Sequence, residues 1–129
     1  MAKRSRFKDL LEFEIIFFER LLKDHPDFVD ALQALGEAYT RSGFYEKGLA
    51  IDQRLTQLKA GDPIVWYNLG CTYALLKRAE DAFAALRKAI ACGYDDFEYL
   101  LKDPDLSSLR DSPNFRRLLE EHVSSKPAT

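Results

Sequence analysis

The sequence predicts an all-α fold of stacked helical hairpins. Four positions share one side of a helix through their spacing of i, i+3, i+4 and i+7: Trp66, Leu69, Gly70 and Tyr73. Residues of the same kinds stand 34 positions earlier at the same spacing, a period typical of helical repeats: Leu32, Leu35, Gly36 and Tyr39. A glycine inside a helix costs about 1 kcal/mol relative to alanine, so Gly70 marks a place where a second helix leaves no room for a Cβ.

The composition fits a helical domain with an apolar core. The chain has 129 residues, of which 47% are hydrophobic and 31% charged, and this balance excludes a disordered chain. Its net charge of −2 gives no global attraction to nucleic acid or anionic lipid. The basic residues of the first eight positions are interpreted as a short solvated stretch.

The cysteines and histidines indicate neither a disulfide scaffold nor a metal site. Cys71 and Cys92 belong to no C-x-x-C pair, and His25 and His122 stand far apart in sequence. The apolar segment 7–22 contains too many charges for a signal peptide or a membrane span. We therefore expect a cytoplasmic protein without metal, cofactor or membrane insertion.

Residues 5–24 predict one long amphipathic helix. Most of its apolar residues fall within an arc of about 160°: Phe7, Leu10, Leu11, Ile15, Phe17, Phe18, Leu21 and Leu22. Ile16 points almost the opposite way, and Phe13 lies beside the arc.

Two helical hairpins are predicted next. Asp27 is the expected N-cap of a helix over 28–41, which ends at Gly43, and its partner helix covers 45–59. Asp62-Pro63 starts the second hairpin, with helices over 63–76 and 79–92.

The repeat fails after residue 96. Pro104 falls at the position of the helix glycine and cannot continue a helix. Residues 97–121 therefore predict a terminal cap with a helix over 113–121, and residues 122–129 a frayed tail. The cap has its own apolar face: Leu106, Leu109, Phe115, Leu118 and Leu119.

The run W-x2-L-G-x2-Y resembles the tetratricopeptide repeat, a helical hairpin of 34 residues. The resemblance implies one domain, 1–129, folded as a right-handed solenoid. Its parts would be an N-terminal half repeat (5–26), repeat one (27–61), repeat two (62–96) and the cap. The cap pattern D-P-x-L-x-x-L-R-x-x-P-x-F also resembles the segment that ends many bacterial arrays of this family. Gly48 matches the family's small residue between the two helices, whereas Asp52 and Lys77 depart from the family pattern.

No catalytic motif is present in the sequence. It contains no Gly-rich phosphate loop, no H-E-x-x-H and no recognisable set of Ser, His and acid. Cys71 is interpreted as a small buried or groove-lining residue rather than a reactive thiol. We therefore expect a non-enzymatic protein.

The resemblance implies a concave groove that binds a peptide or helix of a partner protein. Mapped onto this chain, the groove would be lined by residues of both repeats: Asp30, Gln33, Glu37, Thr40, Arg41, Ile64, Tyr67, Asn68, Cys71, Ala74 and Leu75. Tyr67 beside small residues would hold an apolar anchor, and the acidic residues of repeat one would favour a basic end on the ligand.

An alternative is a self-assembling module, or an accessory subunit of a larger enzyme or secretion complex. The first helix has no preceding partner helix in this chain, so one of its faces would be open. That face is predicted to include Leu11, Glu14, Phe18 and Leu21, and to support weak homo-oligomerisation or partner docking.

Overall fold

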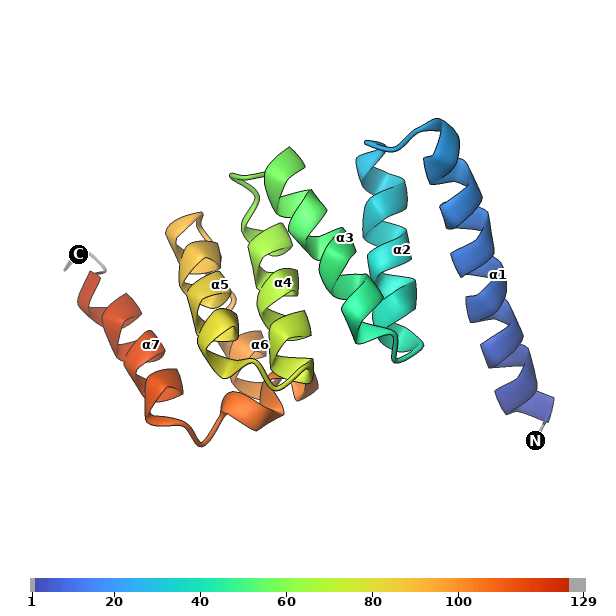
Figure 1. Ribbon diagram of the computed structural model, residues 1–129. Coiled ribbons are helices and arrows are strands. Elements are labelled where there is room, and N and C mark those ends of the chain that lie inside the picture. The colour runs from blue at the N-terminus through green and yellow to red at the C-terminus, as the bar shows by residue number, and fades with distance from the viewer. Residues whose placement is uncertain (1, 126–129) are drawn as a thin grey trace. The chain divides into compact units, whose positions relative to one another are not determined.

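The computed structural model describes the backbone of residues 2–125 and the side chains of residues 6–122. Every regular element in this range is a helix, which confirms the all-α class (Figure 1). The helices form two compact units, Met1–Ala60 and Gly61–Thr129. The division lies one residue before the end of the segment predicted as repeat one, 27–61.

Unit 1 consists of α1 (Ala2–Asp24), α2 (Val29–Arg41) and α3 (Tyr45–Leu58). In Figure 1, α1 lies beside α2, and α2 forms a hairpin with α3. The predicted helices over 5–24, 28–41 and 45–59 are confirmed to within three residues at each end.

The helices α2 and α3 approach closely where two glycines face the opposite helix. A Cβ on Gly36 would lie 3.1 Å from Cγ2 of Ile51, and one on Gly48 would lie 3.0 Å from Oγ1 of Thr40. Gly48 is thus confirmed as a small residue at the helix contact. Asp52 is buried at the same crossing, with its Oδ1 3.3 Å from the Cβ position of Gly36.

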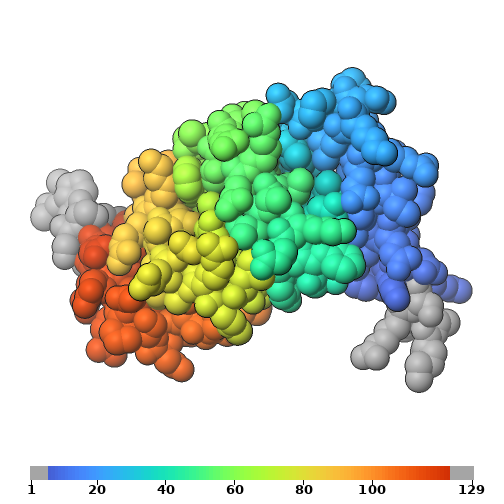
Figure 2. All heavy atoms as spheres, viewed as in Figure 1, coloured from blue at the N-terminus to red at the C-terminus, as the bar shows by residue number. Residues whose placement is uncertain are grey.

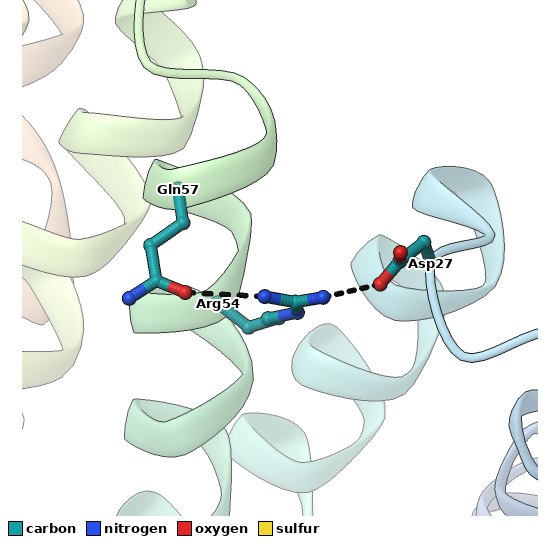
Figure 3. Close-up of polar contacts among 3 residues, drawn as sticks. All are labelled: Asp27, Arg54 and Gln57. Carbon is teal, nitrogen blue, oxygen red and sulfur yellow. Dashed lines mark hydrogen bonds and ion pairs between the residues drawn. The ribbon is translucent and has the colours of Figure 1, made fainter.

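The predicted N-cap role of Asp27 is wrong. The residue before α2 is Phe28, and no side chain caps the first turn. The Asp27 carboxylate instead pairs with Arg54 of α3, and Nη1 of Arg54 also donates to Oε1 of Gln57 at 3.2 Å (Figure 3). A charged donor offers a stronger hydrogen bond than a backbone amide does. Asp27 therefore links the start of α2 to α3.

Unit 2 contains α4 (Pro63–Leu75), α5 (Ala79–Ala91), α6 (Phe97–Lys102), the 3₁₀ helix η1 (Pro104–Leu109) and α7 (Pro113–Ser125). The predicted start of α4 is confirmed, because Oδ1 of Asp62 accepts from the Ile64 amide at 2.9 Å and Pro63 is the first helical residue. Pro104 begins η1 and does not extend α6, as expected of a residue that cannot continue a helix.

Gly70 lies at the tightest helix contact of unit 2. A Cβ at this position would be 2.9 Å from both Cγ and Cδ2 of Leu86 and 3.4 Å from the Ala82 carbonyl oxygen. Real Cβ atoms essentially never come that close to a neighbour. The close approach predicted for the motif glycine is confirmed, with Leu86 and Ala82 of α5 as the nearest neighbours.

The two hairpins repeat the same turn geometry at the spacing read from the sequence. Gly43 and Lys77 hold equivalent positions and both have positive φ, 82° and 63°. In each turn the next amide bonds a carbonyl five residues earlier, Phe44 to Tyr39 at 2.8 Å and Arg78 to Tyr73 at 2.9 Å. Lys77 thus adopts the left-handed conformation, which costs a residue with a Cβ about 1 kcal/mol relative to glycine.

The segments α6, η1 and α7 form the cap and complete the core of unit 2. Figure 2 shows the orange and red cap residues lying against the yellow residues of α5. The core joins side chains of α4 and α5 to those of the cap: Tyr67, Cys71, Ala74, Ala82, Phe83, Leu86, Ala89, Tyr94, Leu100, Leu106, Leu109, Phe115 and Leu118.

The last helix is longer than predicted. It continues through Ser125, so the frayed tail predicted from residue 122 is wrong over 122–125, and residues 126–129 lie outside the described part of the chain. The His122 ring stacks on Phe97 with a centroid distance of 3.8 Å. This contact anchors the turn of α7 that contains His122.

Candidate functional site

The predicted groove residues of α2 are accessible to different degrees. Asp30, Glu37 and Arg41 are exposed, whereas Gln33 and Thr40 are half-buried. Arg41 pairs with Glu37 at 3.7 Å and lies over the Phe7 ring, 5.7 Å from its centroid. The Glu37 charge is therefore partly balanced by Arg41.

The predicted groove residues of α4 are largely covered, which corrects the expectation of an open groove there. Tyr67, Cys71 and Ala74 are only 6%, 7% and 0% exposed. The cause is η1, which packs on this side of α4 and donates from Oγ of Ser108 to the Ala74 carbonyl at 3.2 Å. Three predicted residues remain at least partly accessible: Ile64, Asn68 and Leu75.

A buried polar cluster fastens the cap to α4. The Tyr67 hydroxyl donates to Oδ2 of Asp103 at 2.6 Å, and the Tyr67 ring stacks on Tyr94 with centroids 4.3 Å apart. The thiol of Cys71 contacts the same oxygen at 3.7 Å, and Oδ1 of Asp103 accepts from the Asp105 amide at 3.0 Å. We call these five residues the Asp103 cluster. Because Asp103 is the N-cap of η1, one carboxylate both starts the cap turn and holds it on α4.

The electrostatics of the cluster favour protonated Cys71 and Tyr67 beside the Asp103 carboxylate. Burial, and then the nearby Asp103, raise the pKa of Cys71 well above its usual value. Burial and the hydrogen bond to Asp103 likewise raise the pKa of Tyr67. A thiol that keeps its proton is a poor nucleophile. The sequence left open whether Cys71 is buried or lines the groove, and the structure buries it. Its thiol is not activated.

The same cluster contains a group of atoms spaced like metal ligands. Sγ of Cys71 and one carboxylate oxygen each from Asp103 and Asp105 lie within 4.8 Å of one another. Both oxygens of Asp103 already accept hydrogen bonds, from Tyr67 and Cys71 on one side and from the Asp105 amide on the other. These bonds give both oxygens of Asp103 a partner without an ion.

The buried phenol predicts a characteristic loss of stability in alkali. The pKa of Tyr67 is higher in the folded than in the unfolded chain, so its contribution is present below about pH 10 and is lost as the pH rises further. Tyr67→Phe should be less stable than the parent at neutral pH, because Asp103 loses a donor, but should lose less stability above pH 10. Urea unfolding followed by circular dichroism across the pH range measures both effects.

Tyr39 contributes equally to the alkaline loss of stability in the parent and in Tyr67→Phe. Burial, followed by the hydrogen bond to Glu19, raises the pKa of Tyr39 to about 12, and this group titrates in both proteins. Equal alkaline slopes for the parent and Tyr67→Phe would contradict the prediction.

The open face of α1 differs from the predicted one. Leu11 is buried, and Glu14, Phe18 and Leu21 are half-buried. The exposed apolar residues are instead those beside them: Phe7, Leu10, Phe13, Ile16 and Phe17. A single neighbouring helix covers a stripe about 100° wide, and the apolar arc of α1 is wider than that. The packing of α1 on α2 thus leaves part of the arc uncovered, and Phe13 and Ile16 lie outside the arc.

Three of these side chains form a continuous row, which we call the α1 stripe. Leu10, Phe13 and Phe17 are 62%, 67% and 51% exposed, and the rings of Phe13 and Phe17 stack with centroids 6.3 Å apart. Their spacing of i, i+3 and i+7 is visible in the sequence, and a search for heptad spacing would have found it.

The other exposed apolar residues of α1 have neighbours of their own. Phe7 lies under the Arg41 guanidinium. Ile16 lines a hollow of about 600 Å³ within unit 1. The other lining residues come from α1, from the turn between α1 and α2, and from α2 and α3: Glu19, Arg20, Leu22, Lys23, Pro26, Leu32, Leu35 and Ile51. The α1 stripe is thus distinct from both.

Asp103 is the residue of structural importance that the sequence reasoning missed. Its signal was the Asp-Pro pair at 103–104, which repeats the Asp62-Pro63 helix start. The N-cap role could have been read from that pair, but the bond to Tyr67, 36 residues away, could not.

Over the part of the chain that the structure describes, no helix combines the length and the apolar character needed to cross a bilayer.

Comparison with known proteins gives a partial similarity. No protein-family model matches this chain. The chain is similar to a chloroplastic protein of Arabidopsis thaliana, with 32% identity over 96 residues. The matched region makes up 70% of this chain and 28% of that protein. The chain therefore spans less than a third of the length of this relative.

Proposed function

We propose that this chain is a protein-interaction module of the tetratricopeptide type, with its hairpins arranged as a right-handed solenoid. The repeated turn at Gly43 and Lys77 and the repeated helix contacts at Gly36 and Gly70 support this proposal. Repeats of this kind bury their apolar faces on neighbouring helices, and α1 leaves several apolar side chains exposed.

The exposed α1 stripe is the observation that carries the functional proposal. Leu10, Phe13 and Phe17 form a continuous apolar row on a helix, and such rows on soluble proteins mark docking surfaces. Aromatic side chains contribute most to interface energies. We assign to the stripe the binding of an apolar helix face of a protein partner.

The concave groove is the weaker alternative for the binding surface. Its expected aromatic anchor, Tyr67, is buried and hydrogen-bonded to Asp103. The accessible groove residues of α2 are mainly charged, and Arg41 is already paired with Glu37. The α1 stripe offers a larger accessible apolar surface, so we prefer it.

We propose a non-catalytic role for the chain. The Asp103 carboxylate and the Cys71 thiol are engaged in fastening the cap. The cytoplasm is the compartment expected from the sequence. The name of the Arabidopsis relative makes a chloroplast the alternative.

Site-specific photo-crosslinking tests the docking surface. A benzoylphenylalanine at Phe13 or Phe17 replaces one exposed aromatic ring by another and should leave the fold intact. Irradiation in extracts of the native cells should give discrete protein adducts from both positions. The same probe at Phe44, which is also half exposed but lies outside the stripe, is the matched control. Absence of adducts from 13 and 17, or equal adducts from 44, would overturn the proposal.

A further inference from the structure

The α1 stripe continues at both ends into charged residues. Six exposed side chains follow the spacing i, i+4, i+7, i+11, i+14 and i+18 along one side of α1: Arg6, Leu10, Phe13, Phe17, Arg20 and Asp24. This alternation of four and three residues is the spacing of a coiled-coil seam. The seam extends over about 27 Å of helix.

The seam is symmetric about residue 15. Positions 6 and 24, 10 and 20, and 13 and 17 are equally far from this centre. Two copies of α1 packed antiparallel would therefore bring each member of a pair against the other member in the second copy. This is the self-complementarity that a two-fold interface requires.

The side chains in each pair suit one another chemically. Phe13 would meet Phe17 of the second copy, so that four rings form the centre of the seam. Leu10 would meet the aliphatic stem of Arg20, whose guanidinium can remain in solvent. Arg6 at one end would meet Asp24 at the other.

The charges select the orientation of the two helices. A parallel pair would oppose Arg6 to Arg6 and Asp24 to Asp24, whereas an antiparallel pair opposes unlike charges at both ends. None of the ion pairs between described residues involves Arg6, Arg20 or Asp24. These charges are therefore available for an intermolecular contact.

We propose that the chain associates with a second copy of itself through an antiparallel pairing of α1. This inference rests on the proposed docking role of the α1 stripe and names its partner. A seam of one helix pair is small for a protein interface, so the dimer should form at micromolar or higher concentration. The exposed ion pairs add a modest share of the affinity and fix the register.

Reciprocal charge reversal in sedimentation equilibrium tests the pairing. Asp24→Arg or Arg6→Asp alone places like charges at both ends of the antiparallel seam, and the dimer dissociation constant should rise about tenfold. The double variant Arg6→Asp/Asp24→Arg restores both pairs and should return close to the parent value. Glu46→Arg, a charge change on an exposed residue of α3, should have no effect.

Phe13→Glu tests the apolar centre of the seam. The side chain is two-thirds exposed in one copy, so the variant should melt like the parent while the dimer is lost. Phe44→Glu is the matched control and should dimerise normally.

Three outcomes would overturn the inference. The first is a parent chain that stays monomeric up to millimolar concentration. The second is a single charge reversal that does not change the dimer dissociation constant, as expected for a parallel pair. A double reversal that fails to restore the dimer is the third. If the chain is monomeric but Phe13 still crosslinks to a different protein, the proposed docking function survives and only the self-pairing fails.

Discussion

Gly70→Leu should lower the free energy of unfolding by about 3 kcal/mol. Even a methyl group at this position would lie 2.9 Å from Cγ of Leu86. Leu86 is fully buried, so it can turn only against the side chains packed around it. The larger leucine must push α4 and α5 apart, which removes packing along the whole hairpin.

Urea unfolding of Gly70→Leu and three further glycine variants measures this effect. Gly61→Leu is the control, because a Cβ there meets nothing within 4 Å, and its stability should stay within about 0.5 kcal/mol of the parent. Gly36→Ala should be milder than Gly70→Ala, since its nearest neighbour is the Ile51 methyl at 3.1 Å and not a branch carbon at 2.9 Å. A Gly70→Leu protein as stable as the parent would contradict the close contact of α4 and α5.

Asp103→Ala should also destabilise the fold by about 3 kcal/mol. The substitution leaves the buried Tyr67 hydroxyl without its acceptor, which costs about 1–3 kcal/mol, and removes the cap of η1, which costs about 0.5–2 kcal/mol. Asp103→Asn keeps an acceptor oxygen and should lose less. Asp111→Ala changes an exposed carboxylate of the following turn and should be nearly neutral.

Thiol accessibility reports on the cap separately from global unfolding. In a Cys92→Ser background, Cys71 of the parent should react slowly with a thiol reagent because it is buried beneath η1. Asp103→Ala should increase this rate at denaturant concentrations well below the unfolding transition. An unchanged rate would show that the Asp103 cluster does not hold the cap in place.

The cap changes how a binding surface on this chain is assigned. The segment Asp103–Leu109 lies on the side of α4 where the sequence places a peptide ligand, and its Asp103 takes the hydrogen bond of Tyr67. The aromatic residue expected to anchor a partner thus anchors the chain to itself. An exposed row of apolar side chains lies on α1 instead: Leu10, Phe13 and Phe17.

The sequence by itself determined where most of the helices begin and end. Helix ends depend on signals a few residues long, such as the positive φ of Gly43 and the start at Asp62-Pro63, and these appear where the sequence predicts them. The close contact at Gly70 was also readable, because a glycine inside a helix is unfavourable without such a contact.

The tertiary structure decided which neighbour each helix face meets. Periodicity gives the side of a helix on which a residue lies, but not the segment that covers it. Asp27 pairs with Arg54 of α3 and does not cap α2. Tyr67 is covered by η1 and bonds Asp103, which lies 36 residues later in the chain. In α1 the apolar arc is wider than one helix can cover, and only the packing on α2 determined that Leu11 is buried while Leu10, Phe13 and Phe17 remain exposed.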